Sequence, residues 1–365
     1  MDSITEGALQ QLLDIWQVDE ADVKRGQNGF DWLPGSHVVR VRAIKAEAGN
    51  QQFEILNLYE TADPASGRVR LSVETDVLTD VPAEPVMASV ISAIAPHISS
   101  SYALVHPPEA FMRELKLGNE DRALSFFSSI YLSEELSGWL PRFLAQMALM
   151  QPIDAEIRST ELPELFRGGR PNYATGQKRL QPDGILEVAN DIFVPAGQTR
   201  SRWAGTNEFS DFADAWGRSD LCFANGDDTG LTAEVPFGHR SALIRCWTDQ
   251  RHPQLGAGLL VTTQLPFWPH SDPLPEVACF LNFSEARSWT DFPQFGCWHT
   301  QGRNDKSQTL AHSSFIPNAL FQRGFVFNFI MWETARVGWV RRTFCAKLTD
   351  LPMSEILHRR HGLSG

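Results

Sequence analysis

The chain has 365 residues, more than the roughly 250–300 at which a single hydrophobic core usually stops growing, so two domains are expected. Hydrophobic residues make up 42% of the chain and charged residues 21%, which is typical of a globular protein and excludes general disorder. The formal net charge of -12 repels phosphate backbones and anionic membranes, so we expect neither nucleic acid nor membrane as a partner.

The N-terminus and the cysteines indicate the cellular compartment of the protein. Residues 1–16 contain three acidic and no basic side chains, which is not the pattern of a signal peptide, and no uncharged apolar run approaches the roughly 18 residues of a membrane span. The cysteines are odd in number and irregularly spaced, unlike a secreted disulfide framework: Cys222, Cys246, Cys279, Cys297 and Cys345. We therefore predict a cytoplasmic protein with reduced thiols.

Hydrophobic periodicity predicts the elements of the first half. In chain order they are a helix over Ile4–Val18, strands over His37–Ala43, Phe53–Tyr59 and Arg68–Val77, a helix over Pro85–Ile98, strands over Tyr102–His106 and Ala123–Leu132, and a helix from Ser133 to about Met150. The stretch Gly26–Gly35 is rich in turn-forming residues and is predicted to be a loop.

A break in this periodicity indicates a domain boundary. Residues 158–185 contain short stretches with Gly and Pro, such as Arg167-Gly168-Gly169-Arg170-Pro171. They are predicted to be a linker. The predicted domains are therefore a first α+β lobe over 1–157 and a second α+β lobe with longer loops over 186–365.

The second half repeats this order of elements. The predicted elements are a helix over Phe209–Trp216, a hairpin of Leu221–Ala224 and Leu231–Val235, strands over Ser241–Thr248 and Gly258–Leu265, a helix over Pro275–Ala286, strands over Gly296–Thr300 and Thr309–Ile316, and an apolar segment over Phe325–Val340. Ser128-Ser129 and Ser313-Ser314 occupy similar places in the two halves. We therefore predict an α+β fold with two similar lobes, each an antiparallel sheet with helices packed on it.

The order helix, three strands, helix, two strands and closing helix resembles the type III secretion chaperone-like fold, which YbjN-like bacterial proteins share. Segments that carry the resemblance include Val69–Val77, Val86–Ile98, Ala123–Met150 and Thr309–Phe315. Proteins similar to this fold are often dimers that bind polypeptide segments. The resemblance implies a protein or peptide partner, and either a monomer with an internal pseudo-dimer or a homodimer.

Motifs for catalysis are sparse. Asp228-Thr229-Gly230 matches the triplet of aspartic proteases, but that chemistry needs two carboxylates and the triplet occurs once, so a hairpin turn is the better interpretation. Cys297, His299 and His312 could approach one another on neighbouring strands, but no spaced zinc motif is present. We therefore assign no catalytic residue, no metal and no cofactor.

The second lobe is the expected place of any specific function because it is rich in Trp and His. The binding candidates come from an aromatic loop, from the segment between two predicted strands and from two further predicted strands: Trp268, His270, His252, Trp298, His299 and His312. The favoured hypothesis is a non-enzymatic interaction protein, chaperone- or adaptor-like, that binds a polypeptide. The alternative is a hydrolase with an acid–base or metal site in the second lobe or between lobes, drawing on groups such as Asp249, Asp272 and Glu276.

Overall fold

The computed structural model describes two β-sheets, the helices packed on them and the segments that join them. The described residues are 10, 14, 23–26, 28–32, 38–45, 69–79, 104–106, 123–131, 139–161, 199–216, 223–252, 255–266, 274–290, 292–301 and 309–342. All structural statements below refer to these residues.

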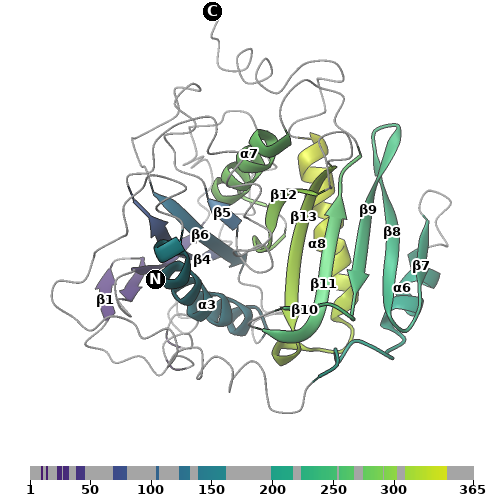
Figure 1. Cartoon of the computed structure of the whole chain (residues 1–365), viewed down its shortest axis with the longest axis horizontal. Coiled ribbons are helices and arrows are strands. Elements are labelled where there is room, and N and C mark those ends of the chain that lie inside the picture. Colours follow the sequence, from purple (N-terminus) through teal and green to yellow (C-terminus); the bar gives the residue numbers. More distant parts are fainter. Residues whose placement is uncertain are drawn as a thin grey trace, which may run out of the picture.

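The first sheet has six strands in the order β1-β2-β3-β4-β6-β5, and every neighbouring pair is antiparallel. Its strands are β1 Val23–Gly26, β2 Gly29–Trp32, β3 Val39–Lys45, β4 Val69–Leu78, β5 Leu104–His106 and β6 Leu124–Tyr131. The helix α3, Trp139–Glu161, follows β6 and packs on β4 and β6 (Figure 1).

The second sheet has seven antiparallel strands, six of them in the order β12-β13-β11-β9-β8-β7 with β10 paired to β11. Its strands are β7 Ala224–Gly226, β8 Gly230–Phe237, β9 Arg240–Trp247, β10 Arg251–His252, β11 Gly256–Gln264, β12 Cys297–Gln301 and β13 Thr309–Pro317. Its helices are α6 Glu208–Trp216, α7 Leu274–Arg287, the 3-10 turn η4 Asn318–Leu320 and α8 Phe325–Val340.

The two sheets have the same strand order. When β10 is set aside, each sheet has six strands, and the strands β1 to β6 of the first sheet match, in chain order, β7, β8, β9, β11, β12 and β13 of the second. In both sheets the strands lie side by side in the order first, second, third, fourth, sixth, fifth. In both, a helix follows the sixth strand. The α+β fold with two similar antiparallel lobes is therefore confirmed, and the shared strand order is what an internal repeat predicts.

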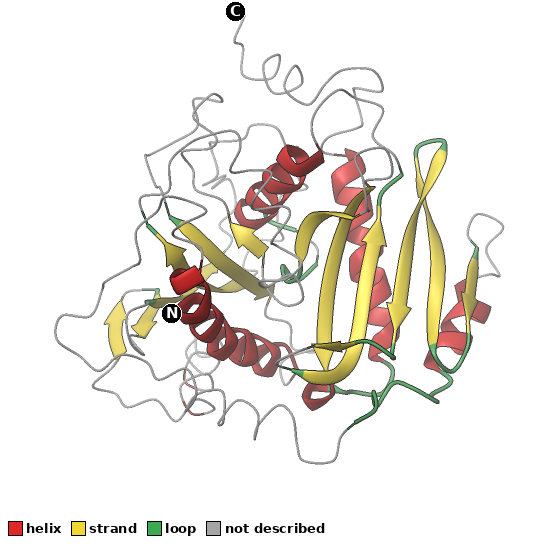
Figure 2. Cartoon of the chain, in the orientation of Figure 1, coloured by secondary structure: helices red, strands yellow, loops and turns green. Residues whose placement is uncertain are grey.

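Alternation of side chains orients the second sheet. Ala242, Ile244 and Cys246 of β9 are buried, whereas the intervening Leu243, Arg245 and Trp247 are partly exposed. The buried face packs on α8, since Thr263 of β11 shares this face and donates a 2.6 Å hydrogen bond to Glu333 of α8. Figure 2 shows α8 lying along the sheet. The opposite face of β8 and β9 therefore carries the partly exposed side chains.

An aromatic cluster joins the two lobes. The Trp139 ring at the start of α3 lies 4.5 Å from that of Phe325 and 6.0 Å from that of Trp332, both on α8. Its indole NH donates a 2.8 Å hydrogen bond to the carbonyl oxygen of Leu320. Phe143, one turn further along α3, packs edge-on against Phe295 at 4.6 Å. Buried apolar side chains of both lobes consequently form one continuous core.

Polar contacts also cross between the lobes. The backbones of Ser129 on β6 and Gln294 exchange two hydrogen bonds of 2.8 Å. The buried Arg70 guanidinium on β4 donates to the carbonyl oxygens of Ala286 and Ser288, at the end of α7, at 3.4 and 3.1 Å. A cation at this end is also favourable for the helix dipole of α7. These contacts fix β4 and β6 of the first sheet against the second lobe.

Several predicted elements differ from the structure. The loop predicted over Gly26–Gly35 contains most of the β1–β2 hairpin, whose turn has Gly29 at φ +153 where a Cβ would collide with Val41. The helix predicted to end near Met150 continues to Glu161, through Pro152. The strand predicted over Phe53–Tyr59 lies outside the described residues, as do nearly all of the helix over Ile4–Val18 and the whole of that over Pro85–Ile98.

The proposed division at 158–185 stays a prediction, because residues 162–185 lie outside the described part of the chain. Residues 158–161 belong to the last turn of α3. Among the described helices, none combines the length and the apolar composition that a membrane span needs.

Candidate functional site

Trp298 and His312 are brought together in the buried interior of the second lobe. They are directly opposite each other on β12 and β13, with ring centroids 5.2 Å apart, and both are fully buried. The backbone of Gly296 has φ +80, and a Cβ there would lie 2.7 Å from Cε1 of His312. Glycine at this position is thus needed for the packing of the imidazole.

These two rings contact a cluster of buried ions. The Trp298 indole donates a 2.7 Å hydrogen bond to Glu285 of α7, and His312 Nδ1 lies 3.3 Å from Glu333 Oε2 of α8. Arg336, also on α8, bridges both carboxylates: its Nε lies 3.1 Å from Glu285 Oε1 and its Nη1 donates to Glu333. The cluster thus links two helices to the central strands.

The electrostatics of the cluster favour its charged form. Burial alone would raise the pKa of Glu333, but Arg336 and His312, with a hydrogen bond from Thr263, lower that pKa to about 2. Burial would likewise lower the pKa of Arg336, yet the two carboxylates raise it. The two acids and the guanidinium are therefore held together as one buried ionic cluster. The groups are enclosed by protein, so the arrangement holds the helices on the sheet and offers no access to a substrate.

The other predicted binding residues lie apart from this cluster. His299 is on the opposite face of β12 and its Nε2 lies 2.8 Å from Ser313 Oγ. His252, on β10, stacks on Phe315 with centroids 5.3 Å apart, and its Nδ1 accepts a hydrogen bond from the Leu255 NH. Burial lowers the pKa of His252 to about 4. Trp268 and His270 lie outside the described residues.

Trp298, His299 and His312 are each buried and form internal contacts, and their binding role stays a prediction. The alternation of these residues along short strands predicts a sheet. It does not reveal that other segments of the chain cover both faces of that sheet. Glu285, Glu333 and Arg336 were missed, although Glu333 and Arg336 at i,i+3 within the apolar segment Phe325–Val340 were a signal of a buried ion pair. In the described part of the chain, no three His, Cys, Asp or Glu side chains are placed to hold a metal ion.

The aspartic-protease-like triplet Asp228-Thr229-Gly230 lies at the β7–β8 connection, which confirms the predicted turn. Asp227 Oδ1 accepts hydrogen bonds from Thr229 N at 2.7 Å, Thr229 Oγ1 at 2.6 Å and Gly230 N at 3.1 Å. The Asp–Thr–Gly residues thus serve the geometry of a hairpin.

Exposed apolar side chains gather at the outer edge of the second lobe. Phe327 and Met331, one turn apart on α8, are 50% and 38% exposed. Phe212 of α6 connects them to Trp216, with ring centroids 5.5 Å from Phe327 and 5.2 Å from Trp216. We call the set Trp216, Phe327 and Met331 the α6–α8 aromatic surface.

Phe223, just before β7, is 58% exposed but lies on the opposite face of the sheet, because it is directly opposite Glu234, which shares a face with Leu243. The Trp216 indole donates to the carbonyl oxygen of Glu234, while the Glu234 NH donates to the carbonyl oxygen of Phe223. The exposed carboxylates Asp211 and Asp214 lie on α6 beside the aromatic rings. The surface therefore combines exposed aromatic area with a negatively charged border.

Comparison with known proteins identifies no relative. No protein-family model, no curated protein and no solved structure matches this chain.

Proposed function

We propose that this chain is a non-enzymatic interaction protein, chaperone- or adaptor-like, that binds a polypeptide on the α6–α8 aromatic surface. The observation that carries the proposal is the exposure of Phe327 and Met331 on one face of α8, beside Trp216. Large exposed apolar side chains that gather in one place are typical of protein-binding surfaces, and aromatic residues dominate binding energies there.

The partner best suited to this surface is an amphipathic helix with basic residues beside its apolar face. Phe327 and Met331 are spaced i,i+4, as are the anchors that two packed helices present to each other. Asp211 and Asp214 offer carboxylates to Lys or Arg side chains of such a helix, and the net charge of -12 attracts it from solution. The type III secretion chaperone-like resemblance supports the same proposal, since the two lobes repeat one strand order.

We further propose that the protein works in the cytoplasm. Cys246 is a buried free thiol, which suits a reducing compartment. The hydrolase alternative is less well supported, because aromatic rings, among them Trp139 and Phe295, pack the junction between lobes where a catalytic cleft would be needed.

The proposal is tested by affinity capture from the native cytosol. The double variant Phe327→Ser with Met331→Ser is compared with Leu243→Ser, which makes an apolar-to-polar change on the opposite face of the same sheet. We expect the wild type and Leu243→Ser to retain one specific protein, and the double variant to bind it at least about tenfold more weakly, as loss of hot-spot contacts implies. Absence of a specific partner, or equal capture by the double variant, would contradict the proposal.

A further inference from the structure

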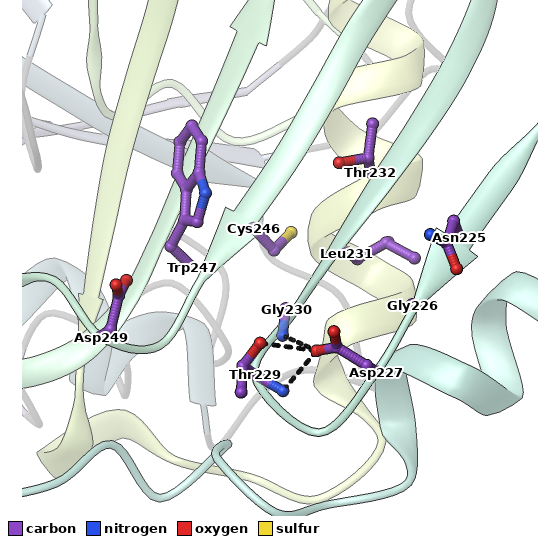
Figure 3. A pocket seen from close by; sticks show the side chains of 10 residues that line it. All are labelled: Asn225, Gly226, Asp227, Thr229, Gly230, Leu231, Thr232, Cys246, Trp247 and Asp249. Atoms are coloured by element: carbon purple, nitrogen blue, oxygen red, sulfur yellow. Dashed lines mark hydrogen bonds between the residues drawn. The ribbon is translucent and has the colours of Figure 1, made fainter.

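A pocket of about 360 Å³ lies at the end of β7, β8 and β9, away from the α6–α8 aromatic surface (Figure 3). Its lining comes from two turns and three strands: Asn225, Gly226, Asp227, Thr229, Gly230, Leu231, Thr232, Cys246, Trp247 and Asp249. This volume is within the range of small-molecule sites, roughly 300–1,000 Å³.

Strand register places four of these residues on one face of the sheet. Gly230 is directly opposite Trp247, and Asn225 is directly opposite Thr232. All four are on the face turned away from α8, where Trp247 is partly exposed. Gly230 contributes no side chain, and a Cβ there would collide with the carbonyl oxygen of Cys246. The pocket thus has a bare backbone strip beside an indole ring.

Carboxylates supply the charge of the pocket. Asp227 and Asp249 are exposed and come from the β7–β8 turn and from the turn after β9 (Figure 3). Hydrogen bonds from the Thr229 hydroxyl and the Thr229 backbone NH to the carboxylate lower the pKa of Asp227, so this group stays ionised in mildly acidic solution. Its Oδ2 accepts no hydrogen bond from the described residues, because all three bonds to the side chain end on Oδ1.

No Lys, Arg or His is among the ten lining residues. Arg245 is on the same sheet face, directly opposite Thr232, and its Nη1 donates a 2.9 Å hydrogen bond to Gln264 of β11. Arg245 is thus engaged toward the neighbouring strand. Two uncompensated carboxylates beside an aromatic ring favour a cationic ligand.

We infer that this pocket is a binding site for a guanidinium group, which stacks on Trp247 and donates hydrogen bonds to Asp227 and Asp249. A guanidinium is planar, stacks on aromatic rings and presents several N–H donors in a fixed plane, whereas an ammonium group has a compact charge without a stacking surface. Asn225 and Thr232 supply further polar atoms on the same face. The inference is independent of the proposed polypeptide surface, which lies on different residues.

The inference is tested by titrating the purified protein with N-acetyl-L-arginine methylamide, followed by calorimetry and by the indole NMR signal of Trp247. The neutral citrulline analogue has nearly the same shape and is the ligand control. We expect saturable binding of the arginine probe with a dissociation constant on the order of 1 mM or tighter, since a single small fragment makes few contacts. No saturation by about 20 mM, or equal binding of the citrulline analogue, would overturn the inference.

Variants locate the site. Asp249→Asn and Trp247→Leu are each expected to weaken binding of the arginine probe at least about fivefold, as loss of a charge-assisted or cation–π contact implies. Asp228→Asn is the matched control: it removes the same charge from an exposed position in the same turn that does not line the pocket. Equal weakening by Asp228→Asn would mean a diffuse electrostatic effect and would refute a defined site.

Agmatine, a free guanidinium compound, separates two sources of the ligand. Tighter binding of the capped arginine than of agmatine assigns the pocket to an arginine side chain of a polypeptide, whereas the reverse order assigns it to a small molecule. Both results retain the guanidinium site. Loss of partner capture by the variant with Phe327→Ser and Met331→Ser leaves both titrations unchanged, so the two proposals fail or succeed separately.

Discussion

At the scale of single residues, the fold depends on buried charges that compensate one another. Glu285, Glu333 and Arg336 are fully or almost fully buried, and every one has an ionic or hydrogen-bonded partner. A buried ion pair adds little stability over an apolar replacement, but removal of one partner leaves a charge without compensation. The cluster therefore makes the packing of α7 and α8 sensitive to single substitutions.

Arg336→Met tests this sensitivity. The substitution leaves two carboxylates buried without their cation, so the free energy of unfolding is expected to fall by about 3–5 kcal/mol. Urea denaturation followed by circular dichroism measures the change. Arg323→Met, at an exposed Arg just before α8, is the control and should change the free energy by less than about 0.5 kcal/mol. A loss below about 1 kcal/mol in Arg336→Met would contradict this role of the cluster.

The low pKa of Glu333 predicts the acid dependence of stability. Its pKa is lowered from 4.5 to about 2 in the fold, so the carboxylate contributes stability above pH 4.5 that is lost as the pH falls toward 2. The loss is on the order of 2–3 kcal/mol. In Glu333→Gln, the free energy of unfolding at neutral pH is expected to be lower and its decline between pH 4.5 and 2 smaller.

His252 acts in a separate pH window. Its pKa is lowered from 6.5 to about 4, so the unfolded chain takes up a proton first and stability declines as the pH falls from 6.5 to 4. Denaturant midpoints measured across both windows therefore distinguish the two groups. If the free energy of unfolding of Glu333→Gln declines below pH 4.5 as steeply as that of the wild type, Glu333 is not the group that titrates there.

At the scale of elements, α3 connects the lobes through its first turns. Trp139→Ala removes the ring contacts with Phe325, Phe329 and Trp332, and is expected to lower the free energy of unfolding by about 3–5 kcal/mol. Trp139→Phe keeps an aromatic ring but leaves the Leu320 carbonyl without its donor, at a cost of about 1–3 kcal/mol. Thermal unfolding by calorimetry measures both.

Phe223→Ala serves as the control for Trp139→Ala, because it truncates an aromatic ring that is 58% exposed. We expect it to change the free energy of unfolding by less than about 0.5 kcal/mol. Similar losses at both positions would mean that the contact between α3 and α8 contributes no particular stability.

The sequence predicts strands and helices of the second lobe well where apolar periodicity and Gly or Asp turns coincide, as in β9, β11 and α7. It fails in α3, because a proline disfavours but does not prohibit a helix when flanking residues are buried: Ile153 and Ala155 follow Pro152 and are both buried. It also misses β1 and β2, since Gly and Asn in a short hairpin resemble those of a loop.

At the scale of the whole molecule, the repeat of element order is visible in sequence but the contacts between lobes are not. The pairing of Ser129 with Gln294 spans 165 positions, and no local pattern specifies it. The same limit explains the candidate site: Trp298 and His312 are conspicuous by residue type, but their burial depends on helices that fold over them from elsewhere in the chain. Trp247, by contrast, is partly exposed, because no helix of the described chain packs on its side of β9.

The continuous core predicts that both lobes unfold together. Arg70, Ser129 and Trp139 of the first lobe all bond to the second, so loss of either lobe exposes apolar and polar groups of the other. Trp fluorescence reports mainly on the second half, which holds eight of the 11 Trp residues, and far-ultraviolet circular dichroism reports on both. We expect the urea midpoints of the two signals to coincide within about 0.2 M. The dependence of the free energy of unfolding on urea concentration should be that of a unit as large as the whole chain. Two separated transitions would mean that the lobes are independent domains joined only by the linker predicted at 158–185.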